Sequence, residues 1–416
     1  MTKEYFQAYK FLRNPGMTLV EMLVATTMTL VIMGVVVQLF GMVGNGVTAS
    51  RASLRMSSEL RSVSHTLRTD LNGITVETVP PATVAADAGY LEIVEGSGTD
   101  TSLGFTQLTG DADDLLMFTT RSFSRLFVGK LGGSDVIESP YAEVAWFCRQ
   151  AAKQPVAGST LYNLYRRQLL IMDYVGAGSF HGTNSINGSL PAAYADNDLS
   201  LRRSSGSGRL LPNGLSDVTK RENRFLHNFS GAVSALAFPY ENAVTNIDDG
   251  PLSGNRLGED IVLSNVLAFD VRVFDPAAEV LEDTAAGVAV IAGDPGYTNG
   301  AQFSPRIFGA YVDMGTVGSG VFASVNSKSQ LTTPTYDTWS NHYEFNGLDE
   351  DGNYGNDQKV NLIDDDMNQI VDDSNELETS PPYPVPLRGL EVRIRIYDTS
   401  TRQVRQVTVR HTFVPH

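Results

Sequence analysis

Cysteine is nearly absent from this sequence, with Cys148 the single example in 416 residues. That scarcity excludes an internal disulfide framework and a cysteine-based zinc cluster. The six histidines are scattered, and no phosphate loop, G-x-S-x-G elbow or H-E-x-x-H helix occurs. We therefore expect no enzymatic activity. Cys148 follows Trp146 and Phe147 in an apolar run, which predicts a buried and inert thiol.

Charged residues are also scarce, at 19%, and they are unevenly placed. The formal net charge is −16, but the segment from Glu344 to Glu378 holds 12 acids against one base, Lys359. This segment therefore carries −11 and leaves −5 for the rest of the chain. Overall acidity argues against a protein that coats nucleic acid, because such a surface must be basic. The charge of each local surface, and not the net charge, therefore indicates which partners the protein can bind.

The N-terminus is basic at first and then strongly apolar. Residues 1–16 hold three bases and one acid, whereas no charged residue occurs from Met22 to Ser50. About 20 apolar residues in a helix cross a bilayer, and the preceding bases match the positive-inside bias. We expect residues 17–47 to span a membrane once. Glu21 is a costly charge in such a helix, which marks it as functional unless its carboxylate snorkels to the surface.

The helix is expected to continue beyond the membrane as far as residue 72. Leu60, Val63, Leu67 and Leu71 recur at spacings of three and four, which is typical of a helix packed on a globular domain. A helix over 17–72 would be about 80 Å long at 1.5 Å per residue. Residues 72–73, Asn-Gly, are a plausible end.

The remainder, residues 73–416, has the pattern of a strand-rich domain. Alternating apolar residues predict a terminal hairpin from Leu390 to Phe413 with its turn at residues 398–401. We expect an α+β fold, in which a long N-terminal transmembrane and amphipathic helix precedes an antiparallel β-rich globular domain. Residues 173–230 and 277–386 are interpreted as surface insertions. The other expected strands are Tyr90–Val94, Leu115–Phe123, Glu143–Arg149, Leu161–Met172, Ala232–Phe238 and Asp260–Phe274.

The acidic segment contains the same pattern twice, 15 residues apart. Carboxylate and amide oxygens at alternate positions of a turn are the ligands that calcium prefers, so the repeat predicts two calcium loops. The alternative is a solvated acidic loop without an ion. The sixth and twelfth positions depart from an EF-hand, and the loops resemble shorter Asp-rich calcium loops. The predicted ligands are Asp349, Asp351, Asn353 and Asp357 in the first loop and Asp364, Asp366, Asn368 and Asp372 in the second. Asp365, Asp373 and Glu376 are further candidates that would complete a shared site.

Arginines gather on the predicted terminal hairpin. One interpretation is a solvated sheet face, and the other is contact with DNA or with an acidic partner subunit. The residues are Arg388, Arg393, Arg395, Arg402, Arg405 and Arg410.

The start of the chain resembles the type IV pilin and pseudopilin superfamily. The resemblance lies in Pro15-Gly16-Met17-Thr18-Leu19-Val20-Glu21 and the apolar helix after it, about a tenth of the chain. It implies that residues 1–16 are a leader, that prepilin peptidase cuts between Gly16 and Met17, and that the new amine is methylated. It also implies that Glu21, at the fifth mature position, pairs with a subunit's amino terminus during assembly. Met17 stands where the family usually has phenylalanine.

The order of the later strands resembles the minor pseudopilin J of type II secretion and PilW-type minor pilins. Residues 114–118, 143–147, 164–167, 266–275 and 387–392 carry this resemblance. It implies a structural subunit of a pseudopilus or its tip, anchored in the inner membrane by one helix with a periplasmic body. Its partners would be other pilin or pseudopilin subunits. The alternative is a minor pilin that serves adhesion, motility or DNA uptake.

Overall fold

The computed structural model describes two compact units, residues 1–55 and 56–416. The described residues are 16–79, 86–97, 110–132, 135–154, 160–172, 190–203, 209–227, 251–318, 320–324, 333–349, 355–373, 375–379, 383 and 385–413. One helix, α1 (Leu19–Asn72), begins in the first unit and ends in the second. Among the described residues it is the one helix that is long and apolar enough to cross a membrane.

The first unit consists of the apolar part of α1 and the residues before it. Side chains from Leu19 to Thr48 are solvent-exposed, although nearly all of them are apolar or small. Such a surface is unfavourable in water and favourable in hydrocarbon. The physical properties of this unit are therefore those of a membrane-crossing segment.

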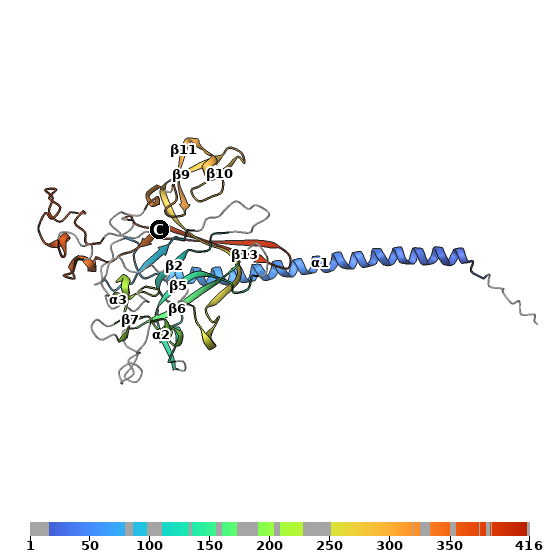
Figure 1. Ribbon diagram of the computed structural model, residues 1–416, viewed down its shortest axis with the longest axis horizontal. Helices are drawn as coiled ribbons and strands as arrows, with labels where there is room; N and C mark the ends of the chain where they lie inside the picture. Colours follow the sequence, from blue (N-terminus) through green and yellow to red (C-terminus); the bar gives the residue numbers. More distant parts are fainter. Residues whose placement is uncertain are drawn as a thin grey trace, which may run out of the picture. The chain divides into compact units, whose positions relative to one another are not determined.

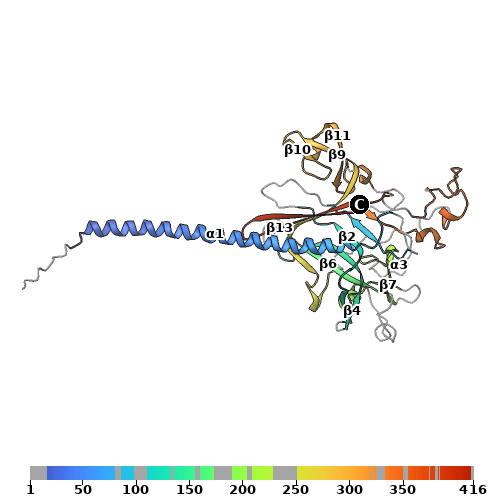
Figure 2. The same ribbon diagram turned by 180° about the vertical axis from the view of Figure 1, so that it is seen from behind.

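The second unit is built on an antiparallel sheet whose strands follow the order β12-β1-β2-β5-β6-β9-β13-β14. Figures 1 and 2 label β2, β6, β9 and β13 of this sheet. β10 (Val288–Val290) and β11 (Gly300–Val312) pair with the distal part of β9, beyond the main sheet. The expected fold class, a long N-terminal helix followed by an antiparallel β domain, is confirmed. The main strands are β1 (Leu91–Val94), β2 (Leu115–Arg121), β5 (Tyr141–Gln150), β6 (Tyr162–Ile171), β9 (Ile261–Asp283), β12 (Thr335–Asp337), β13 (Gly389–Asp398) and β14 (Gln403–Thr412).

The second half of α1 covers one face of this sheet. Leu60, Val63, Leu67 and Leu71 are all buried, as the helical spacing predicts, and they join the larger core cluster. Strand residues that point to this face, such as Trp146, belong to the same cluster. These four residues form one apolar stripe along the helix, and the stripe packs the helix on the sheet.

The other face of the sheet is covered as well, by the described part of residues 190–227. This segment contains α2 (Leu190–Asp196), β7 (Leu201–Arg203), β8 (Leu210–Pro212) and α3 (Leu215–Val218). Its apolar side chains pack on the side chains of β2, β5 and β6 that point away from α1. The expectation of a surface insertion is wrong for this part, because a few apolar residues spread through a polar sequence are enough to complete a core. The buried members are Leu190, Ala193, Tyr194, Leu199, Leu201, Leu210, Leu215, Val218, Phe225 and Leu226.

Most predicted strands have counterparts. The β13–β14 hairpin is present and pairs from Gly389 with Thr412 to Asp398 with Gln403, so its turn is residues 399–402, one residue later than expected. β9 continues to Asp283, past the expected end at Phe274, because its distal part pairs with β10 and β11. A small hairpin of β3 (Phe127–Leu131) and β4 (Asp135–Ser139) was not predicted. The predicted strand at 232–238 lies outside the described residues.

Candidate functional site

The predicted processing junction precedes α1 directly. Gly16 and Met17 are exposed and non-helical. The helix then begins with a capping box, in which the Thr18 backbone N–H donates to Glu21 Oε2 at 2.8 Å and the Glu21 N–H donates to Thr18 Oγ1 at 3.3 Å. Glu21 is therefore satisfied at the helix start, with its side chain exposed. An exposed, non-helical peptide bond directly before a helix is accessible to a protease.

The end of α1 is fixed to the sheet by a buried ion pair. Asp70 accepts two hydrogen bonds from Arg166, each 2.7 Å long, and a third at 3.0 Å from the Trp146 indole N–H. Arg166 lies on β6 and Trp146 on β5, so one carboxylate joins three elements. This bidentate pair sets the position of the helix more specifically than apolar contact alone can do.

A second buried ionic cluster joins β1 and β12 to the segment after α3. Arg221 bonds Glu92 at 2.7 Å, and Arg224 bonds both Glu92 at 2.9 Å and Asp337 at 2.8 Å. His227 lies 3.3 Å from Glu92. Burial by itself acts to raise the pKa of Glu92, but Arg221, His227 and Arg224 outweigh it and hold that pKa well below its ordinary range. The charges are paired, so we interpret this cluster as structural.

Part of the acidic segment is described, and it repeats its own hydrogen bonds at the predicted 15-residue spacing. The Gly347 N–H donates to Asp357 at 3.0 Å, and the Leu362 N–H donates to Asp372 at 3.1 Å. Asp357 and Asp372 both have positive φ, at 50° and 52°. The sequence repeat is thus a structural repeat. Asp351 and Asn353 of the first predicted loop lie outside the described residues.

The second loop brings predicted ligands together. Asp364 and Asp366 each accept a hydrogen bond from the Asn368 backbone, and Asn368 also donates to Asp366 through its side chain at 2.9 Å. Carboxylate oxygens of Asp364, Asp366 and the buried Glu376 lie within 4.8 Å of one another. Glu376 is not one of the eight ligands of the repeat, but it is one of the three acids expected to complete a shared site. It follows the repeat, and only the folded loop returns it to Asp364.

A buried acidic triad was missed by sequence reasoning. Glu95 follows β1, and Asp111 and Asp114 precede β2, so the neighbouring strands bring all three together. Their carboxylate oxygens lie within 4.8 Å of one another, an arrangement that can bind a metal ion. Asp114 accepts from the N–H groups of Gly96 and Val271, at 3.0 and 2.7 Å. No spacing in the sequence signals this triad.

The pKa values of the triad show how unfavourable three buried carboxylates are. Burial, and then repulsion from Asp114, Asp313 and Asp111, raises the pKa of Glu95 well above its ordinary range. Burial and Asp113 raise the pKa of Asp111 to about 8. Burial and Asp111 likewise raise the pKa of Asp114. At neutral pH the site therefore holds protons or a compensating cation.

Two other predicted features have clear outcomes. Cys148 is buried, and burial raises the pKa of its thiol well above the ordinary value, as expected for an inert residue. Within the arginine-rich hairpin, Arg393 and Arg410 both bond the buried Glu391, at 2.7 and 2.6 Å. Arg405 instead extends to Ser57 on α1. Of these three arginines, two therefore bond a buried carboxylate of the hairpin and one reaches the helix.

Comparisons of this chain with protein-family models, with curated proteins and with solved structures find no match. A long apolar N-terminal helix followed by an antiparallel sheet domain is a pilin-like architecture. Any functional conclusion therefore rests on that architecture and on the residues at the start of α1.

Proposed function

We propose that this chain is a structural subunit of a pilus-like filament, with no catalytic role. In the form we favour, it is a J-type minor pseudopilin of type II secretion, inserted in the inner membrane with a periplasmic body. It is then assembled with other pseudopilins. The observation that carries this proposal is the exposed Gly16-Met17 junction directly before a membrane-capable helix whose lone early charge is Glu21.

The physical argument concerns Glu21. In the uncleaved chain its carboxylate is held by Thr18, at the start of its own helix. Cleavage after Gly16 would place a new ammonium at Met17, one residue before that cap. Within a bundle of such helices, an ammonium of one subunit can neutralise Glu21 of another, which removes the cost of an intramembrane charge. Pairing between subunits then favours the assembled filament over the isolated helix.

Processing is tested by N-terminal sequencing and mass spectrometry of the membrane fraction, with and without prepilin peptidase. We expect a methylated Met17 terminus with the enzyme and an intact leader without it. Gly16→Leu should keep the leader in both strains, whereas Gly34→Leu, an equally exposed glycine inside the helix, should be processed normally. An intact Met1 terminus in the strain that contains the peptidase contradicts the proposal.

Assembly is tested with Glu21→Lys and the isosteric Glu21→Gln. Both variants should remain in the membrane and be lost from sheared filaments, whereas Thr29→Val should assemble normally. Normal incorporation of Glu21→Lys contradicts the pairing argument.

Deletion strains separate the favoured type II secretion system from the alternative, in which the chain is a PilW-type minor pilin. Loss of protein secretion supports the former, and loss of surface pili supports the latter.

The proposal includes calcium in the acidic segment. The donors in the second loop are carboxylate and amide oxygens, the hard ligands that suit calcium, and the first loop repeats its hydrogen bonds. Titration calorimetry of the full chain in detergent is the test. We expect calcium binding that Asp364→Asn or Asp366→Asn weakens at least tenfold, while Glu95→Gln, in the buried triad, has no effect. No calcium heat, or heat lost only with Glu95→Gln, contradicts this assignment.

A further inference from the structure

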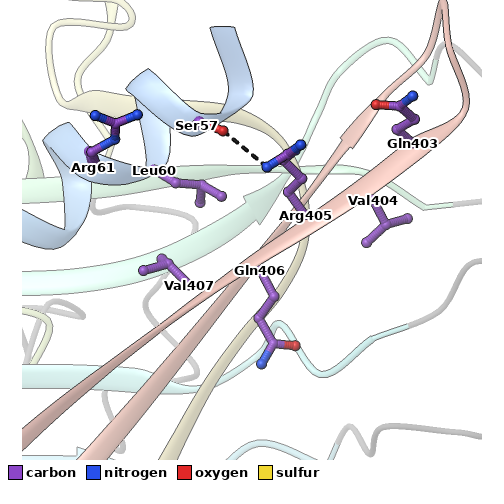
Figure 3. Close-up of a pocket in the computed structure, with 8 residues that line it drawn as sticks. All are labelled: Ser57, Leu60, Arg61, Gln403, Val404, Arg405, Gln406 and Val407. Atoms are coloured by element: carbon purple, nitrogen blue, oxygen red, sulfur yellow. Dashed lines mark hydrogen bonds between the residues drawn. The ribbon is translucent and has the colours of Figure 1, made fainter. Parts of the chain in front are cut away.

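The last strand of the sheet lies beside an open groove. β14 is the final strand in the sheet order, with β13 on one side and no described strand on the other. A groove of about 660 Å³ runs between this strand and α1 (Figure 3). It is lined by Ser57, Leu60 and Arg61 from the helix and by residues 403–407 from the strand. All of these residues belong to the second unit.

The register shows which backbone groups of β14 face away from β13. The Phe413 N–H donates to the Arg388 carbonyl at 3.0 Å, in line with the pairing of Gly389 with Thr412. Hydrogen-bonded pairs alternate along an antiparallel ladder, so residues 403, 405, 407, 409 and 411 bond β13. Residues 404, 406, 408 and 410 then direct their N–H and C=O groups to the outer edge. An edge of this kind, with no partner strand in the described part of the chain, is a template for another strand.

The side chains along the groove combine an apolar floor with positive charge. Leu60 and the partly buried Val407 face the space between helix and strand, as Figure 3 shows. Arg61 is exposed, and Arg405 reaches across to Ser57 Oγ at 3.1 Å. The eight lining residues include two arginines and no acid. A strand added here would turn every second side chain toward this surface.

We propose that the outer edge of β14 binds an extended segment of a neighbouring protein, in which every second side chain faces the groove and these side chains are alternately acidic and apolar. Main-chain pairing with residues 404–410 provides affinity, Leu60 and Val407 receive apolar side chains, and Arg61 and Arg405 receive carboxylates. The acidic segment of the same molecule does not serve, because in Figures 1 and 2 it lies at the other end of the unit from the β13–β14 turn. This proposal does not depend on the filament function.

The test is fluorescence anisotropy with the full chain in detergent and a labelled decapeptide of sequence Glu-Thr-Val-Thr-Glu-Thr-Val-Thr-Glu-Thr, which places Glu and Val alternately on one face. A second peptide is N-methylated on the residues whose N–H groups face β14, and a third replaces Glu by Lys. We expect the first peptide to bind, the methylated peptide to bind at least tenfold more weakly, and the Lys peptide not to bind. Failure of the Glu peptide to bind, or equal binding of its methylated form, overturns the proposal.

Matched variants locate the site. Arg61→Glu should weaken binding at least tenfold, whereas Arg68→Glu, an equally exposed arginine on the same helix outside the groove, should change it less than twofold. Gln406→Pro removes an outward N–H and should weaken binding at least tenfold, whereas Gln406→Ala keeps that N–H and should not. Circular dichroism confirms that each variant is folded. An alternative explanation of the arginines is that their charge prevents two copies of β14 from pairing edge to edge and aggregating. If Arg61→Glu with Arg405→Glu causes aggregation while peptide affinity is unchanged, the arginines serve to prevent aggregation and the proposal is overturned.

Discussion

The anchor at the end of α1 offers the sharpest prediction about stability. Asp70→Asn keeps the shape of the side chain but removes the charge that Arg166 and the Trp146 indole share. The guanidinium side chain is 15% exposed and the carboxylate 3%, so water cannot replace the lost partner fully. The variant leaves a mostly buried cation without its counter-ion, which is the costly way to break a buried pair.

The magnitude follows from the contacts. Removing one partner of a buried ion pair costs about 3–5 kcal/mol, and the slight exposure of Arg166 points to the lower end. Asparagine retains one acceptor for the indole N–H, so the bond to Trp146 adds little to the destabilisation. We therefore expect Asp70→Asn to lower the free energy of unfolding by about 3 kcal/mol.

The assay is urea unfolding of the full chain in detergent, followed by Trp146 fluorescence in a Trp339→Phe background. Asp70→Asn combined with Arg166→Met removes both charges, keeps an acceptor for the indole, and should cost less than Asp70→Asn alone, because no unpaired charge remains. A loss below about 1 kcal/mol would place the pair among exposed ion pairs and refute the reasoning. So would a double variant whose loss equals the sum of the two single losses.

Two further predictions concern the core of the second unit. Folding raises the carboxyl pKa values of Glu95, Asp111 and Asp114, so ionising these groups destabilises the fold. In chelator, their contribution to stability should be greatest below the ordinary carboxyl pKa and fall as pH rises from about 4 to about 8, the pKa of Asp111. Calorimetric melting between pH 5 and pH 8.5 checks this, and a slope that Asp111→Asn leaves unchanged contradicts it. Leu67→Ala, at a fully buried position, should lower the free energy of unfolding by about 2–5 kcal/mol, whereas Leu54→Ala, at an exposed position, should change it little. Urea unfolding measures both variants, and equal losses would show that α1 does not pack on the sheet through Leu67.

Much of the fold follows from local patterns. Hydrophobic spacing along a helix is a local property, so the buried stripe through Leu60 and Leu67 was predictable. Strands with strict alternation, such as the pair from Leu390 to Phe413, were predictable for the same reason. The 15-residue repeat of the acidic segment also reappears as repeated hydrogen bonds to Asp357 and Asp372. Each of these features depends on residues that are close in sequence.

Other features were not predictable, because residues distant in the chain create them. The segment 190–227 has no periodic apolar pattern, and its packing on the sheet depends on where β5 and β6 place their outer face. The triad of Glu95, Asp111 and Asp114 exists because β1 and β2 are neighbours.

By itself, the sequence determined the membrane-capable helix, its amphipathic continuation, the strand-rich body and the repeated acidic loop. Each of these features depends on short-range periodicity or on local composition. Only the tertiary structure decided which carboxylates are buried together, how Asp70 anchors the helix, and which edge of β14 has no described strand beside it. The physical reason is that burial, charge pairing and strand register depend on contacts across the sheet, and no local pattern encodes them.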